Sequence, residues 1–146
     1  MSEIRLERLL AAPPTAVWAA WTDPALLSRW FCPNPDLELE VTADAVVGGG
    51  YRVDMGAGRY VAQGRYTELR PAEVVELTWA WETSPEEVSV VRVELTPAPD
   101  GGTRLVLVHS GLTDEDDATG HGEGWELSLA RLAGLVAEER DPAERA

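Results

Sequence analysis

The fold of this chain follows from one stretch near its end, GHGEGWELSLARLAGL at residues 120–135. Counting from Trp125, apolar or small residues return at the spacing of one helical face. They are Trp125, Ser128, Leu129, Leu132 and Leu135. The stretch therefore predicts a long amphipathic helix that must bury this face against another layer. Because Trp125 lies in its first turn and His121 just ahead, the helix can close one side of a cavity.

The segment before this helix alternates like short β-strands separated by turns. Apolar and polar residues with a period of two, bounded by Gly, Pro and Asp, are typical of half-buried strands. The predicted strands cover residues 37–41, 51–55, 60–69, 74–81, 88–96 and 103–110. Asp100-Gly101, between the last two, is a strong hairpin signal. The close spacing of the strands predicts an antiparallel meander.

The N-terminal segment adds one strand and two short helices. Ile4 and Leu6 alternate with charged residues, as in a half-buried strand. Pro13-Pro14 ends that strand and opens a helix, because proline is tolerated in a first helical turn. Asp23-Pro24, a cap followed by proline, starts a second helix. The predicted fold class is therefore α+β: a curved antiparallel sheet of about seven strands wrapped around the long C-terminal helix, called a helix-grip fold.

Length and charge limit the classes of partner. A chain of 146 residues suits a single domain, which we place at residues 1–140, with residues 141–146 as a disordered tail. The chain carries 26 acidic and 12 basic residues, a net charge of −14. Such a surface repels phosphate backbones and anionic headgroups, so neither nucleic acid nor a membrane surface is an expected partner.

Residue usage excludes further chemistry. Every basic residue is arginine, so Schiff-base catalysis, pyridoxal-phosphate anchoring and a lysine-bearing phosphate loop are not available. Cys32 is the single cysteine and fits a small packed side chain in a reducing compartment. The N-terminus has no apolar run long enough for a signal peptide or membrane span. We expect a cytoplasmic protein that uses no cofactor.

A series of short motifs gives a family resemblance. They are APPTAVWAAWTDP at residues 12–24, Trp30-Phe31, GGYR at 49–52, GRYTEL at 64–69, LTW at 77–79, HSGL at 109–112 and HGEGW at 121–125. Their order and spacing, over roughly residues 3–139, resemble the activator-of-heat-shock-protein-90-ATPase-like family. That family belongs to the START and birch-pollen-allergen-like helix-grip superfamily.

The resemblance implies a fold and a class of ligand. Helix-grip members typically hold apolar or amphipathic small molecules between the sheet and the long helix, and some relatives are polyketide cyclases or dehydratases. The eukaryotic co-chaperones of the family carry a further N-terminal domain that contributes to chaperone binding. We do not expect chaperone binding here, because this chain leaves no room for that domain.

The candidate ligand-binding residues are those that should face the helix across the sheet, together with the helix face itself. Trp79 and Trp81 share strand parity with Leu77, and indole rings are common in the walls of small-molecule pockets. Packing in the core would explain the same pattern. The predicted set is Trp30, Met55, Tyr66, Trp79, Trp81, His109, His121, Trp125 and Leu129.

The two histidines allow different roles. His109 shares parity with Leu105 and Leu107, so it faces the helix either as a general acid or base or as a hydrogen-bonded tie between strand and helix. His121 precedes Trp125 by four residues, so both can share a helix face at the mouth of the cavity. Alternatively, His121 starts the helix and pairs with an acidic loop at residues 114–117. The spacing of the two histidines and Glu123 is poor for zinc, so no metal is expected.

Three alternating glycines, Gly120, Gly122 and Gly124, precede Trp125. No nucleophile motif accompanies them, and we interpret them as a flexible hinge into the helix, a mobile gate over the cavity.

Three functions follow from these patterns. We favour binding of a hydrophobic or amphipathic small molecule between the sheet and the C-terminal helix. The first alternative is a cyclase, dehydratase or hydrolase in which His109, alone or together with His121, moves protons on a bound substrate. The second is a co-chaperone-like protein-interaction module.

The last two predicted strands carry apolar residues on both faces, which bears on the oligomeric state. Val88, Val90, Val106 and Val108 lie opposite the core-facing residues of their strands. A sheet with one solvated face should be polar there, so the outer face is either partly covered or paired with a second subunit. Of the two, we predict a homodimer through these valines.

Overall fold

The computed structural model describes residues 2–58, 60–112 and 115–138. Its elements in chain order are β1 (Ser2–Leu10), α1 (Pro14–Thr22), α2 (Pro24–Leu27), β2 (Leu39–Ala43), β3 (Gly50–Met55), β4 (Tyr60–Arg70), β5 (Val74–Trp81), β6 (Ser89–Pro97), a 3-10 turn at Pro99–Gly101, β7 (Thr103–Leu112) and α3 (Glu115–Glu138). The strands form one antiparallel sheet in the order β1-β7-β6-β5-β4-β3-β2. The tail predicted at residues 141–146 lies outside the described residues.

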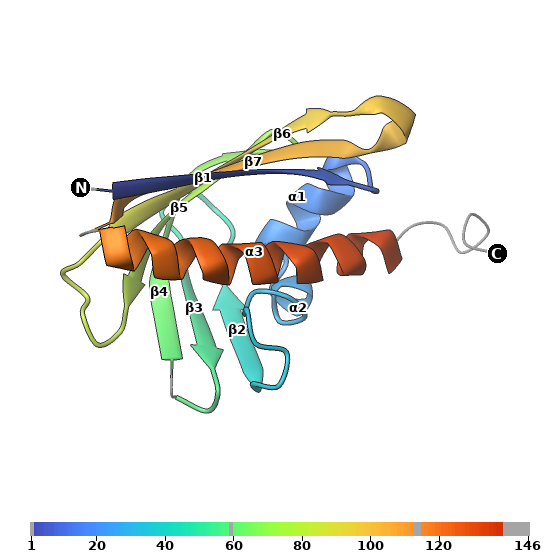
Figure 1. Ribbon diagram of the computed structural model, residues 1–146. Helices are drawn as coiled ribbons and strands as arrows, with labels where there is room; N and C mark the ends of the chain where they lie inside the picture. Colours follow the sequence, from blue (N-terminus) through green and yellow to red (C-terminus); the bar gives the residue numbers. More distant parts are fainter. Residues whose placement is uncertain (1, 59, 113–114, 139–146) are drawn as a thin grey trace.

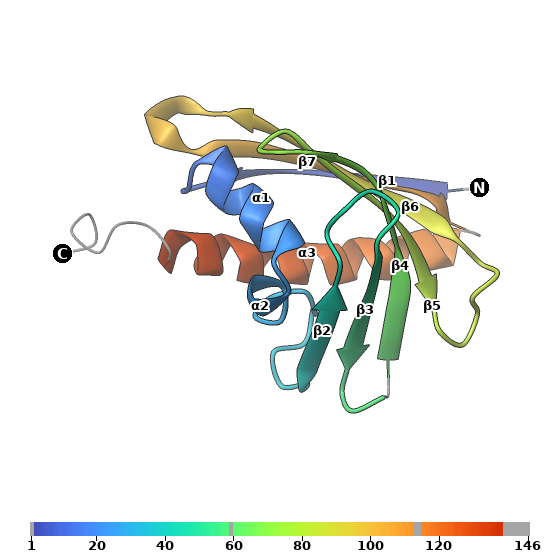
Figure 2. The ribbon, with the colours of Figure 1, turned by 180° about the vertical axis from the view of Figure 1, so that it is seen from behind.

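The sheet curls around α3 (Figure 1). In this view β1, β6 and β7 run along one side of the helix, whereas β2, β3 and β4 stand across it. Seen from behind, α1 and α2 pack beside α3 near the β2 end of the sheet (Figure 2). The prediction of an α+β fold with a curved seven-stranded sheet, two short helices after the first strand and a long C-terminal helix is confirmed.

Local chemistry explains how the two short helices begin and end. α1 starts at Pro14, where a missing backbone N–H costs nothing. It ends at Asp23, whose side chain accepts a hydrogen bond of 2.9 Å from the Ala25 N–H and so caps α2. α2 makes a single turn, and the chain then crosses to β2 through Pro33 and Pro35.

Gly64 lets β4 and β5 approach closely. A Cβ built at this position would lie 2.0 Å from the carbonyl oxygen of Thr78, so no larger residue fits without moving the backbone. Farther along, the register of β4 against β5 shifts between Tyr66 and Glu68. Such irregularities increase the bend of a sheet.

The C-terminal helix is longer than predicted. It begins at Glu115, ahead of the expected start at Gly120, so Gly120, Gly122 and Gly124 all lie inside it. Their interpretation as a hinge ahead of the helix is therefore wrong, and so is an acidic loop for residues 115–117. Asp114 lies outside the described residues. Glycine disfavours a helix interior, which is why the sequence pattern places the start too late.

The core lies between the sheet and α3. The predicted helix face is buried: Trp125, Ser128, Leu129, Leu132 and Leu135 all turn inward. From the other side, β7 contributes Leu105 and Leu107, both fully buried. Among the described residues, no helix is long and apolar enough to cross a membrane.

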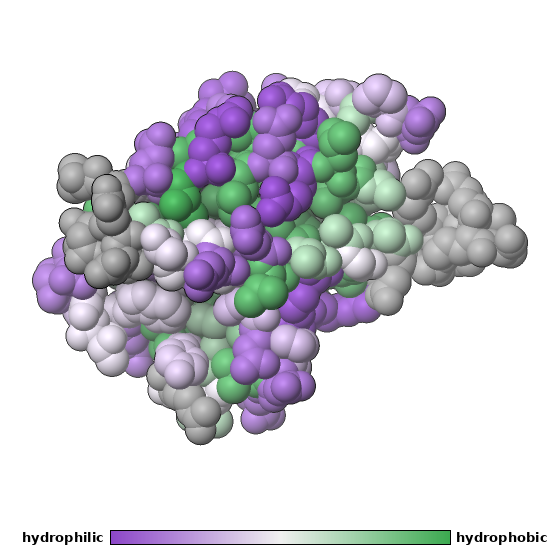
Figure 3. All heavy atoms as spheres, viewed as in Figure 1, coloured by the Kyte–Doolittle hydropathy of each residue, from purple (hydrophilic) through white to green (hydrophobic). Residues whose placement is uncertain are grey.

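The outer face of the sheet is crossed by ion pairs. Arg92 on β6 donates to Glu68 at 2.8 Å and to Glu76 at 2.9 Å, which links three neighbouring strands. Arg104 pairs with Glu7 across β7 and β1. Figure 3 shows hydrophilic side chains over the part of the surface above α3, where β1 lies. Apolar residues on this face are therefore interleaved with charged groups.

Candidate functional site

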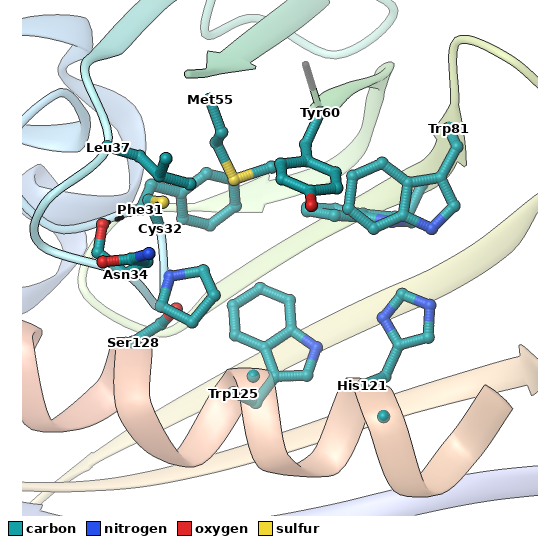
Figure 4. A pocket seen from close by; sticks show the side chains of 14 residues that line it. Phe31, Cys32, Asn34, Leu37, Met55, Tyr60, Trp81, His121, Trp125 and Ser128 are labelled. Carbon is teal, nitrogen blue, oxygen red and sulfur yellow. Dashed lines mark hydrogen bonds between the residues drawn. The ribbon is translucent and has the colours of Figure 1, made fainter. Parts of the chain in front are cut away.

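A cavity of about 460 Å³ lies between α3 and the part of the sheet formed by β3, β4 and β5. Figure 4 shows side chains from the α2–β2 segment, β3, β4 and β5 above the cavity and α3 below it. Its lining consists of Phe31, Cys32, Pro33, Asn34, Leu37, Met55, Tyr60, Trp79, Trp81, Gly120, His121, Gly124, Trp125 and Ser128.

The α3 side of the cavity is one helical face. His121, Trp125 and Ser128 follow each other at intervals of four and three residues, so their side chains rise from the helix in a row (Figure 4). Gly120 and Gly124 lie on the same face and supply no side chain. The two glycines therefore leave room for the cavity next to the Trp125 ring.

Aromatic rings make most of the opposite wall. The Trp79 ring lies edge-on to Phe31, Trp81 and Trp125, with centroid distances of 5.8, 5.6 and 5.7 Å. Edge-to-face pairs at such distances are favourable beyond the area they bury. Trp79 is buried, whereas Trp81 is half-buried and Tyr60 is exposed. The wall is thus packed against the core at Trp79 and accessible to solvent at Trp81 and Tyr60.

His121 closes one end of the cavity. Its ring stacks on Trp81 with a centroid distance of 6.1 Å and an interplanar angle of 24°, and it lies 4.6 Å from the ring of His109. Figure 4 shows the His121 ring on the α3 side of the cavity, opposite Trp81. The Tyr60 hydroxyl lies beside Trp81, on the sheet side. This end therefore combines flat rings with polar groups.

Behind the wall, a hydrogen-bonded chain connects four elements. The Trp125 indole N–H donates to His109 Nδ1 at 2.9 Å, and His109 Nε2 lies 2.7 Å from Ser89 Oγ. Because Nδ1 accepts, the proton of the neutral imidazole sits on Nε2, which donates to Ser89. The Ser89 hydroxyl in turn donates to the Trp79 carbonyl oxygen at 3.3 Å. The chain ties α3 to β7, β6 and β5.

Burial holds His109 neutral. The side chain is fully buried, and this desolvation, with a smaller contribution from His121, lowers the pKa of His109 to about 3. Both ring nitrogens are engaged in the hydrogen-bonded chain. Of the two roles considered for His109, the geometry supports the tie between strand and helix over proton transfer to a ligand.

Five of the predicted ligand-binding residues line the cavity: Met55, Trp79, Trp81, His121 and Trp125. His109 lies outside the lining, behind Trp125. Leu129 is buried one turn farther along α3 and packs in the core. Strand and helix parity predicted the direction in which these side chains point, but not which of them reaches the cavity.

Trp30 and Tyr66 also lie away from the cavity. The Trp30 indole N–H donates to the Ala20 carbonyl oxygen at 2.9 Å, which anchors the ring under α1. The Tyr66 hydroxyl donates to the Trp21 carbonyl oxygen at 3.3 Å, and burial raises its pKa to about 12. Both are core residues with structural hydrogen bonds.

The predicted ligand-binding set omits the lining residues of the segment between α2 and β2. Phe31, Cys32, Asn34 and Leu37 border the cavity because this segment folds back along α3, which no local pattern in the sequence predicts. Tyr60 could have been found. It pairs with Met55 across the β3–β4 turn, and directly paired residues share a face.

Among the residues that the structure describes, the lining includes no Asp, Glu, Lys or Arg side chain. Its polar side chains are those of Asn34, Tyr60, His121 and Ser128 together with the indole N–H groups. The Trp79 N–H is buried and has no hydrogen-bond partner among the described residues. Within that same part of the chain, no cluster of three His, Cys, Asp or Glu residues could hold a metal ion.

Comparison with known sequences places the chain in a family. The sequence model described as activator of Hsp90 ATPase homolog 1-like protein matches residues 11–137. The chain belongs to this family. The resemblance noted in the motifs is thereby confirmed. No curated protein matches the chain.

Solved structures of the family share the fold along nearly the whole chain. Protein CV1439 of Chromobacterium violaceum is 32% identical, with a TM-score of 0.80 over 92% of this chain and 96% of its own. The AHSA1 protein of Silicibacter pomeroyi is 30% identical, with a TM-score of 0.79 over 95% of this chain and 100% of its own. An HSP90 activator of Plasmodium falciparum is 22% identical, with a TM-score of 0.65 over 77% of this chain and 75% of its own, and shares the fold.

Proposed function

We propose that this protein binds a hydrophobic or amphipathic small molecule in the cavity between the sheet and α3. The observation that carries the proposal is the cavity of about 460 Å³ with a mostly aromatic lining. Pockets that take small molecules typically have volumes of roughly 300–1,000 Å³, apolar walls and a few polar groups. This cavity has each of these properties.

The positions of the glycines on α3 support the same function. Gly120 and Gly124 line the cavity at a cost to the helix of about 1 kcal/mol each relative to alanine. A Cβ at Gly124 would lie 3.9 Å from Pro33 Cγ, and none of the described atoms lies within 4 Å at Gly120. Packing therefore does not require glycine at either position. Space for a ligand explains why small residues stand there.

Binding is favoured over proton-transfer catalysis. His109 was the candidate acid or base, but its two ring nitrogens are hydrogen-bonded within the core and its pKa of about 3 keeps it neutral near pH 7. A general base must come within hydrogen-bond reach of the group it deprotonates. His109 is not among the described residues that line the cavity.

Filling the cavity tests the proposal. Gly124→Leu places a branched side chain in the cavity, whereas Gly134→Leu is the matched control on the same helix, because Gly134 is exposed with none of the described atoms near its Cβ position. Native mass spectrometry of the protein expressed in cells should detect a retained small molecule with the wild type and with Gly134→Leu, and none with Gly124→Leu. Equal retention by both variants, or no retained molecule with the wild type, would contradict the proposal.

Chaperone interaction is the second candidate, and the family match is the observation that favours it. A pull-down with purified Hsp90 in buffers of low and moderate salt tests it, with ATPase stimulation as the second readout. Binding that survives moderate salt would support an interaction module. The acidic surface alone would give only salt-sensitive association.

We further propose a homodimer through the outer face of the sheet. Val90 and Val108 are half-buried there, Val106 is nearly buried, and Val88 is 52% exposed just before β6 begins. The charged groups between them would have to pair across the interface.

A further inference from the structure

The chemistry of the cavity wall narrows the class of ligand, an inference that rests on the proposed binding function. Among the described lining residues, the large aliphatic side chains are Leu37 and Met55. The other large side chains of this set are rings: Phe31, Tyr60, Trp79, Trp81, Trp125 and His121. A site for an alkyl chain needs only apolar surface. A wall of rings additionally forms favourable edge-to-face and offset-stacked pairs with an aromatic ligand.

The rings present both edges and faces to the cavity. Trp79 and Trp125 meet at an interplanar angle of 61°, whereas His121 and Trp81 are nearly parallel at 24°. Figure 4 shows Tyr60 and Trp81 on one side of the cavity and Trp125 and His121 on the other. A flat ring in the cavity beside these pairs therefore meets both ring edges and ring faces.

The described lining residues include no Asp, Glu, Lys or Arg side chain, which favours a neutral ligand. A carboxylate or phosphate would find no Arg or Lys side chain among these residues, and the chain's net charge of −14 adds repulsion. Aromatic faces attract organic cations. Among the same described residues, no carboxylate offsets the cost of removing such a cation from water.

Two hydrogen-bonding groups of the wall lack partners in the described residues. The Trp79 N–H is buried without one. The Tyr60 hydroxyl, on a side chain that is 51% exposed, points into the cavity beside Trp81 (Figure 4). Because the Trp79 nitrogen is covered by neighbouring atoms, the more accessible Tyr60 hydroxyl is the better experimental handle.

We propose that the ligand is a neutral aromatic compound with an oxygen substituent, a phenol or an aryl ketone, and that its oxygen lies where Tyr60, Trp81 and His121 meet. The ring system packs between the sheet wall and Trp125. The oxygen accepts a hydrogen bond from the Tyr60 hydroxyl.

Calorimetric titration with small probes tests the inference. The probes are 2-naphthol, naphthalene, decanoate and trimethylphenylammonium, each titrated into the wild type and Tyr60→Phe. We expect 2-naphthol to bind more tightly than the other three. Tyr60→Phe should weaken 2-naphthol by about three- to tenfold, the value of one hydrogen bond, and leave naphthalene unchanged. Naphthalene is thus the control for any change in the shape of the site.

Trp79→Phe removes the buried N–H and keeps a ring. It should change the affinities for 2-naphthol and naphthalene by the same factor, because the Trp79 nitrogen is covered and the ligand oxygen bonds Tyr60. Trp18→Phe is the control, because the Trp18 N–H is bonded to Val74 at 3.1 Å on the α1 side. Because the Tyr60 side chain is exposed, Tyr60→Phe should fold normally. The test can therefore be decided with this variant even if Trp79→Phe does not fold.

The outcomes separate this inference from the proposed function. Tighter binding of decanoate or of the cation, or an equal effect of Tyr60→Phe on both naphthyl probes, overturns the aromatic, oxygen-bearing ligand. In that case the proposed binding function still stands, provided that Gly124→Leu abolishes the retention of a small molecule. If no probe binds and no molecule is retained in cells, the binding function itself fails.

Discussion

The imidazole of His109 is held between two hydrogen bonds, one accepted from Trp125 and one donated to Ser89. These bonds fix its tautomer, and burial keeps it uncharged. At the scale of single residues, strand alternation correctly predicts that His109 faces α3, and its hydrogen bond there orients the Trp125 ring. A sequence shows where a histidine points, whereas its hydrogen-bond partners decide what it does.

This arrangement predicts how stability depends on pH. The pKa of His109 is about 3 in the folded protein against an ordinary value of 6.5, so between these values the unfolded chain binds more protons. His109 therefore contributes stability that is complete above pH 6.5 and declines as the pH falls toward 3. His109→Gln should lose about 1–3 kcal/mol at pH 7 and show a shallower decline between pH 7 and 5 in urea unfolding.

His121→Gln is the control for that measurement, because it removes the other histidine and keeps His109. It should retain most of the wild-type pH dependence. Equal slopes for the wild type and His109→Gln would contradict the assignment of His109 as a buried neutral group.

Among the elements, α3 carries an unusual number of glycines for a helix that packs a long face against the core. Gly122 faces β1, where a Cβ would lie 3.8 Å from the Ile4 side chain, an ordinary contact. Gly120 and Gly124 face the cavity. The helix is therefore held by the packing of its buried face more than by its own propensity.

Alanine substitution on α3 should stabilise the protein. Gly120→Ala and Gly122→Ala each raise helix propensity by about 1 kcal/mol and meet no close contact, so the urea midpoint should rise without a change in slope. Gly64→Ala is the contrasting variant, because its Cβ would collide with the Thr78 carbonyl oxygen and should lower the midpoint. A loss of stability at Gly120 or Gly122 would indicate that glycine is needed there for the backbone.

For the whole molecule, the fold was predictable because its signals are local and repeated. Alternation gave the strands from residue 51 to 110 nearly to their ends, and the Pro13-Pro14 and Asp23-Pro24 pairs gave the two short helices. The start of α3 was missed because Gly120, Gly122 and Gly124 lower helix propensity while tertiary packing overrides it.

The cavity was predictable only in part. Met55, Trp79, Trp81, His121 and Trp125 were found because period and parity show which side of an element faces inward. The boundary between packed core and open cavity depends on how far the α2–β2 segment reaches along α3. That distance is set by contacts between residues far apart in the sequence, and it separates lining residues such as Tyr60 from core residues such as Tyr66.

Assembly is a further property of the molecule as a whole. If the outer face forms a homodimer, sedimentation velocity at micromolar concentration should give the mass of two chains for the wild type. Val108→Glu should give the mass of one chain, because added negative charge on an already acidic face opposes association. Glu3→Gln is a control on the same sheet. A wild type that sediments as a single chain would contradict the dimer.

The crowding of indole rings around Trp79 also has an optical consequence. The Trp79 ring centroid lies 5.6 Å from that of Trp81 and 5.7 Å from that of Trp125, and Trp21 lies 5.9 Å from Trp125. Rings at such separations exchange excitation energy, so their emission and near-ultraviolet circular dichroism behave as properties of the group. Any molecule entering the cavity alters that shared signal, and the chain thus contains its own spectroscopic reporter of occupancy.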